Sequence, residues 1–206
     1  MHPDALAARL ACILLGYLFG SFLTAEVVAR VVSGKSARQL GTGNPGMANI
    51  MAQLGKGAGL LTLAGDTLKT VAACGAAYYA TAPLIGQASI LYAGLGAVLG
   101  HNYPAWAGFR GGKGVAVTCV WLVLYLPFWG TLCCIAGGAL VLWLGYLPLG
   151  AVVIPALAIL PAWLSYGPES GILTLALAII MFSRHYVLLR IRQGTEPRFF
   201  QRRNPK

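Results

Sequence analysis

The chain has 206 residues, of which 58% are hydrophobic and only 10% are charged, whereas an average soluble domain carries about 25% charged residues. This composition excludes an ordinary soluble domain and predicts an integral membrane protein. The net charge of +10 could indicate a nucleic-acid-binding protein, but the basic residues stand mostly in connections between long apolar segments, so we predict no nucleic-acid partner.

Seven apolar segments are near the roughly 20 residues that a helix needs to cross about 30 Å of hydrocarbon. The short alternating segments of a membrane barrel are absent, so we expect an all-α polytopic protein with about seven transmembrane helices. In chain order the segments are 8–31, 57–80, 84–106, 114–130, 132–147, 149–165 and 170–188. No repeat or low-complexity tract divides the chain, so we expect a single integral membrane domain over residues 1–206.

Basic residues concentrate in alternate connections. They occur in the long loop 33–56, in the connection that holds Arg110 and Lys113, and in the tail, whereas the connections near 81–84, 126–132 and 165–169 contain no lysine or arginine. With seven spans, all the basic connections fall on one side of the membrane. The positive-inside rule therefore predicts that the N-terminus is outside and the C-terminus is cytoplasmic.

The longest polar interruption, SGKSARQLGTGNPGMANIMAQLGK, is typical of a loop that binds an anion. Gly41, Gly43 and Gly46 permit a positive φ, which lets successive backbone N–H groups point at one anion. Four side chains could add donors or charge: Arg38, Thr42, Asn44 and Asn49. A flexible connection between helices is the alternative interpretation.

A second glycine-rich basic stretch, GFRGGKGVAV, follows on the same predicted face. Gly111, Gly112 and Gly114 let the backbone approach a ligand closely. Lys113 would stand at the N-terminus of the next helix, where free N–H groups and the helix dipole attract anions. The spacing is not that of a Walker A motif. The two basic residues could instead only anchor helix ends to lipid head groups, but two such loops on one face favour a phosphate site.

Several polar residues fall inside the apolar segments. Asp66 and Lys69 are three residues apart on one helix face, so we expect them to pair. Glu26 could orient a cation of the nearby loop or only pack between helices. For His101 we weigh a hydrogen-bonding hub against a catalyst, and for Ser21 a close-packing position after a glycine against a binding role.

The sequence contains no pattern that indicates a metal or a cofactor. The five cysteines are spread through apolar segments without CxxC or Cys/His spacing, so we predict buried thiols and no disulfide framework. No Ser-His-Asp or Cys-His arrangement is visible either. We therefore expect no metal, no cofactor and no enzymatic nucleophile.

Landmark stretches along nearly the whole chain resemble those of a known family. In order they are YLFGSFL, RQLGTGNPGMAN, LGKGAGLL, GDTLK, LGHNYPAWAGFRGGKGVA, GYLPLGA and LRIRQGTE. Together they resemble the acyl-phosphate:glycerol-3-phosphate acyltransferase family of bacterial inner membranes, the PlsY type. The glycine-lysine hinge with its preceding GH pair is the specific part of the resemblance.

The resemblance implies a function and a location. A fatty acyl group would pass from acyl phosphate to the sn-1 hydroxyl of glycerol 3-phosphate, giving 1-acylglycerol 3-phosphate and phosphate in phospholipid synthesis. The protein would be a multi-pass protein of the bacterial inner membrane. Its partners would be acyl phosphate, glycerol 3-phosphate, membrane lipid and other enzymes of phospholipid synthesis.

Acyl phosphate is an activated mixed anhydride, so holding two anions together and screening their charge should supply much of the catalysis. We expect Lys113 and Arg38 to clamp phosphate and Thr42 to donate a hydrogen bond, these three forming the catalytic group. The other residues predicted to bind substrate phosphates are Gly41, Gly43, Asn44, Gly46, Asn49, Gly111, Gly112, Gly114, His101, Ser21, Arg184 and His185.

The chain departs from the family pattern at several polar positions. Thr42 stands where the family has serine, and Ala52 stands where it has arginine. The closing HRENI motif of the family reads RHYVL here, so that Arg184 takes the histidine position, His185 follows it and Val187 replaces the asparagine. Arg184 is long enough to restore the positive charge lost at Ala52.

Two other functions remain open on the sequence alone. One is a non-catalytic relative that binds a phosphate-bearing lipid precursor or a partner enzyme through the retained glycine loops. The other is a small-anion transporter, which is disfavoured because transporters often show inverted halves and no corresponding halves are visible.

Overall fold

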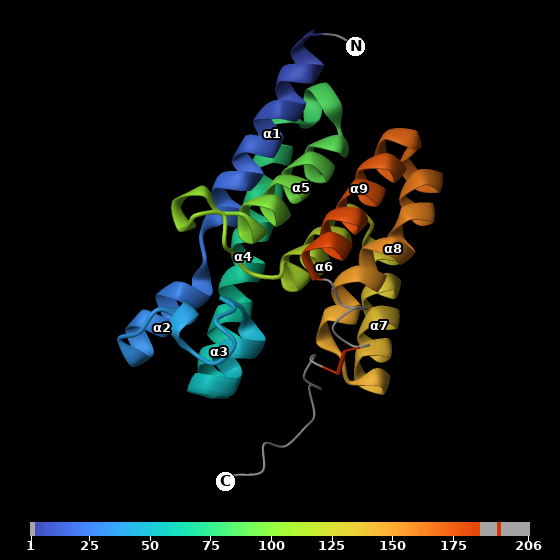
Figure 1. Cartoon of the computed structure of the whole chain (residues 1–206). Helices are drawn as coiled ribbons and strands as arrows, with labels where there is room; N and C mark the ends of the chain where they lie inside the picture. Colours follow the sequence, from blue (N-terminus) through green and yellow to red (C-terminus); the bar gives the residue numbers. More distant parts are fainter. Residues whose placement is uncertain (1–2, 186–192, 195–206) are drawn as a thin grey trace. The chain divides into compact units, whose positions relative to one another are not determined.

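The computed structural model describes residues 3–185 and 193–194, and every regular element within these ranges is helical, as predicted (Figure 1). The α-helices are α1 Pro3–Ser21, α2 Thr24–Ser33, α3 Met47–Leu54, α4 Lys56–Ile85, α5 Ala88–Asn102, α6 Val115–Tyr125, α7 Pro127–Leu144, α8 Leu147–Tyr166 and α9 Pro168–His185. Two short 3₁₀ helices stand in the connections, η1 at Ala37–Gln39 and η2 at Ala105–Ala107.

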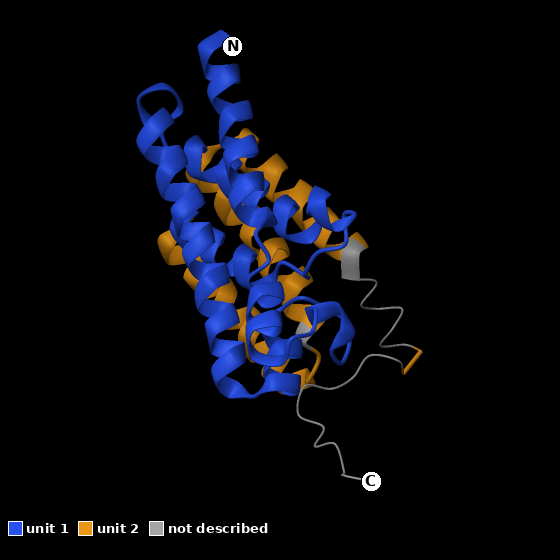
Figure 2. Cartoon of the chain, turned by 90° about the vertical axis from the view of Figure 1, so that its left-hand side faces the viewer, with its two compact units in different colours: residues 1–125 blue, residues 126–206 orange. Residues whose placement is uncertain are grey.

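The chain forms two compact units, residues 1–125 and residues 126–206 (Figure 2). The first unit contains α1 to α6 and the second contains α7 to α9. The prediction that residues 1–206 act as one domain stays a prediction, and each unit is described here by itself.

All seven predicted segments correspond to helices, but only some are long and apolar enough to count as membrane spans. Among the described residues these are Pro3–Ser33, Pro127–Leu144 and Pro148–Tyr166. The protein is therefore an all-helical membrane protein. The count of seven crossings and the direction of the termini stay predictions.

Two boundaries differ from the expected ones. The first predicted helix, 8–31, was expected to be continuous, but it breaks at Phe22 and Leu23, and Leu23 takes an extended conformation (φ −93°, ψ 95°). The fourth predicted segment, 114–130, ends early because α7 already begins at Pro127. Proline favours the first turn of a helix, where its missing N–H is not needed.

The residues of α1 are distributed in the reverse of the pattern of a soluble protein. Four small residues, spaced four apart, form its buried side: Ala8, Cys12, Gly16 and Gly20. Four leucines at the same spacing form its exposed side: Leu6, Leu10, Leu14 and Leu18. Large apolar side chains on the outside and small ones at the helix contact are what a lipid environment favours.

The backbones of α1 and α5 touch at a glycine seam. Gly16 and Gly20 of α1 and Gly96 and Gly100 of α5 each stand four residues apart. A Cβ on either α1 glycine would overlap a carbonyl oxygen of α5, and a Cβ on either α5 glycine would overlap a carbonyl oxygen of α1. This reciprocal pair of GxxxG patterns was visible in the sequence, but we did not predict the contact from it.

The remaining helices of the first unit assemble around α4, which packs against α1, α5, α6, α2 and α3. At its N-terminal end a small buried cluster joins α2, η1, α3 and α4: Ala25, Ala29, Ala37, Ile50 and Ala58. Trp121 of α6 packs where Gly94 of α5 has no side chain, and its indole N–H donates to the carbonyl of Ile90 (3.1 Å).

In the second unit α8 contacts both α7 and α9. Gly137 of α7 leaves room for Ile154 of α8, since a Cβ on the glycine would overlap that side chain. Close approach at glycine thus recurs in this unit. None of the residues that make up the loops described below belongs to it.

The glycine seam generates a stability prediction. Gly20→Ala should destabilise the protein by about 1–3 kcal/mol, because the new methyl overlaps a backbone carbonyl that cannot move aside alone. Gly75→Ala is the matched control, since a Cβ on Gly75 meets no described atom within 4 Å and alanine is the better helix former by up to about 1 kcal/mol. Thermal unfolding in detergent, followed by circular dichroism, compares the two. Equal midpoints would contradict the seam.

Candidate functional site

The hinge at residues 110–114 rests on the C-terminal end of α5. The N–H of Gly111 donates to the carbonyl of Asn102 (3.0 Å), and the N–H of Gly112 donates to that of His101 (2.9 Å). A Cβ on Gly111 would overlap the His101 carbonyl, and one on Gly112 would overlap the imidazole Nε2. The close approach predicted for these glycines is real, but the partner is the protein's own backbone and histidine.

Lys113 stands directly before a helix, as the sequence predicts. It is half-buried between the buried Gly112 and Gly114, and α6 begins two residues later at Val115. Gly114 has a left-handed backbone (φ 73°), and a Cβ there would overlap the side-chain amide of Asn102. The hinge is therefore held rigidly on both sides of Lys113.

The glycines of the first loop meet the conformational prediction in part. Gly41 and Gly43 have positive φ values of 50° and 70°, as expected. Gly46 does not: it is extended (φ −153°), precedes α3 and donates its N–H to the carbonyl of Asn44 (2.9 Å). The absence of a side chain at Gly46 matters for space instead, since a Cβ would lie 2.9 Å from the Asn44 amide nitrogen.

Asn49 organises this loop from within. Its side-chain carbonyl accepts the N–H of Thr42, and its amide donates to the carbonyls of Leu40 and Asn44, each at 3.0 Å. The N–H of Gly43 also stays within the loop, on the carbonyl of Leu40 (2.8 Å). The expected nest therefore does not present the N–H groups of Thr42 and Gly43 to an anion. The phosphate contact of Asn49 stays a prediction, and its observed partners are backbone atoms.

Arg38 joins the two glycine-rich loops. Its Nη2 donates to the carbonyl of Ala107 (3.2 Å) and to that of Arg110. One guanidinium thus links the first loop to the segment 107–110, about 70 positions later in the chain, where the hinge begins. The predicted phosphate contact of Arg38 is untested, but its observed role is to hold the loops at a fixed distance.

Glu26 holds the start of the same loop. Its carboxylate accepts from the Ser36 hydroxyl (2.9 Å), from the N–H of Ala37 (3.0 Å) and from Nε of Arg30 (2.7 Å). The contacts match neither of the two roles weighed for Glu26: its carboxylate anchors the start of the loop through Ser36 and Ala37, and the cation that it pairs with, Arg30, belongs to its own helix.

Asp66, Lys69 and His101 form a buried cluster under the hinge. The ammonium of Lys69 lies 2.8 Å from Oδ1 of Asp66, which confirms the predicted pair, and 2.8 Å from Nδ1 of His101. It also donates to the carbonyl of Phe22 (2.7 Å), which the helix break leaves free of an α1 partner. His101 is 3% exposed and its Nδ1 bonds to Lys69; the choice between the two roles weighed for it, a hydrogen-bonding hub and a catalyst, stays a prediction.

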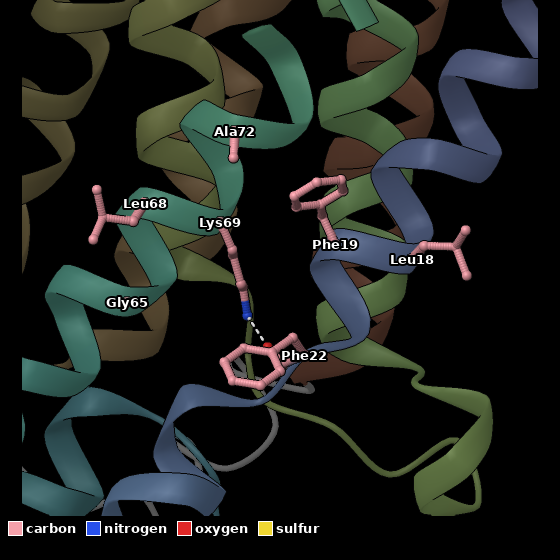
Figure 3. Close-up of a pocket in the computed structure, with 7 residues that line it drawn as sticks. All are labelled: Leu18, Phe19, Phe22, Gly65, Leu68, Lys69 and Ala72. Atoms are coloured by element: carbon pink, nitrogen blue, oxygen red, sulfur yellow. Dashed lines mark hydrogen bonds between the residues drawn. The ribbon is translucent and has the colours of Figure 1, made fainter. Parts of the chain in front are cut away.

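An apolar groove of about 600 Å³ runs between α1 and α4 beside this cluster (Figure 3). Its lining residues are Leu18, Phe19, Phe22, Gly65, Leu68, Lys69 and Ala72. In Figure 3 the Lys69 side chain extends along the groove toward the backbone of Phe22, so the only charged group of the lining lies at one end.

The predicted site residues Ser21, Arg184 and His185 remain. Ser21 ends α1, donates its hydroxyl to the carbonyl of Leu18 (2.8 Å) and accepts the Trp106 indole N–H on its own carbonyl (2.8 Å). Arg184 and His185 are the last two residues of α9, in the second unit, and their side chains lie outside the described part of the structure. Val187 lies outside the described residues.

Sequence reasoning missed two residues that shape the site. Tyr17 accepts the N–H of Ala105 (2.9 Å) and donates to the carbonyl of Tyr103 (2.8 Å), which fixes the chain as it leaves α5. Asn102 is fully buried against Gly114. The signal for Asn102 was present in LGHNYP, where a polar pair ends an apolar segment, but only the histidine was considered.

The contacts of Asn49 generate a local prediction. Asn49→Ala removes three bonds that tie the loop together. The carbonyls of Leu40 and Asn44 each keep a backbone N–H donor, so the N–H of Thr42 is the group that loses its partner, at a cost of about 1–3 kcal/mol where water does not reach it. We expect faster amide hydrogen exchange in residues 40–46 of the purified protein. Asn44→Ala is the control because it keeps all three bonds. Equal exchange in both variants would show that Asn49 does not order the loop.

The chain is similar to known proteins. Residues 10–193 match the family model described as Glycerol-3-phosphate acyltransferase. The chain is 44% identical over 118 residues to glycerol-3-phosphate acyltransferase 1 of Lactobacillus acidophilus, a match that covers 57% of this chain and only 56% of that relative. It is 38% identical over 191 residues to the glycerol-3-phosphate acyltransferase of Roseobacter denitrificans, covering 92% and 93% of the two chains.

A solved structure is similar as well. The crystal structure of PlsY, an integral membrane glycerol 3-phosphate acyltransferase in its glycerol 3-phosphate form, superposes with a TM-score of 0.80 at 28% identity. The superposition covers 92% of this chain and 94% of PlsY. Because the family model matches residues 10–193 and a relative that is 38% identical matches nearly the whole chain, the chain belongs to the glycerol-3-phosphate acyltransferase family.

Proposed function

We propose that this protein transfers a fatty acyl group from acyl phosphate to the sn-1 hydroxyl of glycerol 3-phosphate. The products are 1-acylglycerol 3-phosphate and inorganic phosphate. The observation that carries the proposal is the position of Lys113, half-buried between two glycines in a rigid hinge at the start of α6. A cation held in that way, in a unit that also has an apolar groove, suits a substrate that has both a phosphate and a long chain.

The reaction needs positioning more than it needs a protein nucleophile. The sn-1 oxygen of glycerol 3-phosphate attacks the carbonyl carbon of acyl phosphate, and a carbon–oxygen ester bond forms. The bond from that carbon to the phosphate oxygen breaks, and the phosphate leaves with the electron pair. The proton of the attacking hydroxyl passes to the departing phosphate. Because both substrates are anions, bringing them together with fixed positive charge lowers the barrier.

The observed contacts divide the predicted site residues into two groups. Lys113, the Thr42 hydroxyl and the Asn44 amide are proposed to touch substrate phosphates. Arg38 and Asn49 are proposed to act by holding the loops, since their side chains bond to backbone atoms of those loops. The proposal thus depends most on Lys113.

The acyl chain is proposed to lie in the groove between α1 and α4. The lining is almost entirely apolar. Lys69, its one charged residue, bonds to His101, and Gly112 of the hinge packs against the His101 imidazole. A chain in the groove would therefore have its reactive end close to Lys113. We also propose seven crossings of the bacterial inner membrane with the loops on the cytoplasmic side, which the distribution of basic residues supports.

The first test is direct. Purified protein in detergent, given palmitoyl phosphate and glycerol 3-phosphate, should release phosphate and form 1-acylglycerol 3-phosphate in equal amounts. Lys113→Ala should lower kcat/KM by about 10²–10³-fold, as expected when one preorganised positive group is removed from a reacting phosphate. Lys35→Ala, an exposed lysine of the other loop, is the control and should change it little.

Two outcomes would contradict the proposal. If folded protein forms no product but binds glycerol 3-phosphate in a way that requires Lys113, the protein is a binding protein. If the two lysine variants lose activity equally, the hinge is not the phosphate site.

The groove is tested through chain length. Ala72→Trp should fill the groove and reduce activity with palmitoyl phosphate far more than with a short-chain acyl phosphate, because a long chain no longer fits beside the indole. Val71→Trp adds the same side chain at the same depth on an exposed face that does not line the groove. A preference for short chains in both variants, or in neither, would exclude this groove.

A further inference from the structure

The ammonium of Lys69 is bonded to other groups of the protein. An ammonium has three N–H donors and no acceptor. Lys69 is 7% exposed, donates to the Phe22 carbonyl (2.7 Å) and to Nδ1 of His101 (2.8 Å), and is paired with Asp66 (2.8 Å). Two hydrogen bonds and one ion pair thus engage this ammonium within the protein itself.

The partners of Lys69 belong to three different segments. Phe22 lies in the break between α1 and α2, Asp66 lies one turn away on α4, and His101 is the next-to-last residue of α5. Lys69 therefore connects the end of α1, the middle of α4 and the end of α5 at one buried point.

One branch of this connection leads to the hinge through His101. Because an ammonium can only donate, Nδ1 of His101 must accept, and its proton resides on Nε2. A Cβ on Gly112 would overlap that nitrogen, so Gly112 packs directly against the edge of the imidazole. The carbonyl of His101 also accepts the Gly112 N–H (2.9 Å). The orientation of the ring thus controls the residue next to Lys113.

The other branch leads to the first loop through Phe22. The bond to the Phe22 carbonyl fixes the break after which α2 begins. On α2, Glu26 binds the start of the loop at Ser36 and Ala37, and Arg38 of that loop bonds to the chain just before the hinge. Both branches therefore end where the proposed phosphate contacts lie.

We propose that Lys69 is a positioning residue for acyl transfer. Its ammonium bonds to protein atoms and not to substrate phosphate; it fixes the imidazole of His101 and the α1–α2 break, and so sets the place of Lys113 relative to the first loop. This inference rests on the proposed function. A displacement of a reacting group by about 1 Å can lower a rate by about 10²-fold, so the effect should fall on kcat rather than on KM.

The variant that tests this is Lys69→Met with Asp66→Asn. Methionine is similar in length, and the second change avoids leaving a buried carboxylate unpaired. We expect kcat to fall by about 10–100-fold with KM for glycerol 3-phosphate changed by less than about threefold, and faster hydrogen exchange at residues 108–114.

Thr81→Val is the matched control. Thr81 lies on the same helix, and its hydroxyl bonds to Ser89 of α5 (2.7 Å), twelve residues away from Lys69 and remote from both loops. It should leave kcat and hinge exchange unchanged. A folded Lys69 double variant with normal kcat and normal exchange would overturn the proposal, as would equal losses in the control.

Two further measurements do not depend on how that variant folds. His101→Phe keeps a ring but removes the acceptor, and it should loosen the hinge in the same way. In the unaltered protein, the ¹⁵N spectrum of the histidine rings, assigned with His101→Phe, should show His101 protonated at Nε2. Protonation at Nδ1 alone would overturn the proposal. Since exchange and tautomer need no turnover, they distinguish a failure of this inference from a failure of the acyltransferase assignment.

Discussion

The contact between the backbones of α1 and α5 is the constraint on which the rest of the first unit depends. It requires glycine at Gly16, Gly20, Gly96 and Gly100, because carbonyl oxygens occupy the space of each Cβ. In a membrane the hydrophobic effect does not drive helices together, so close packing of backbones supplies much of the attraction. This contact fixes the end of α5, and the end of α5 in turn carries the hinge.

From that seam outward, polar contacts replace apolar packing as the chain approaches the loops. Along the seam the helices meet through small residues, whereas the buried Asp66–Lys69 pair lies next to the end of α5 that carries the hinge. On the side of the two glycine-rich loops, Glu26, Arg38 and Asn49 each bond to backbone atoms of a loop. The loops are thus ordered by side chains that reach them from helices or across from each other, and ligand binding would not have to supply that order.

The sequence predicted the parts of this arrangement that depend on local patterns. Helices followed from apolar segment length, the Asp66–Lys69 pair from spacing on one helix, and the position of Lys113 from glycines before an apolar stretch. The parts that it did not predict depend on distant partners: Arg38 bonds to Ala107, and Lys69 to the Phe22 carbonyl, across long stretches of chain. The extended Gly46 was missed because glycine permits many conformations, and only the Asn44 carbonyl selects this one.

The seam also has a consequence for biosynthesis. Gly20 contacts Ala97, which is 77 residues later in the chain (97 − 20). At a synthesis rate of about 5–20 residues per second, α1 must reside in the bilayer for roughly 4–15 s before its partner has been made. During that interval its small-residue face has no partner from α5, and the insertion machinery or surrounding lipid must cover it. The order of the helices in the chain thus leaves α1 open to wrong pairing during synthesis.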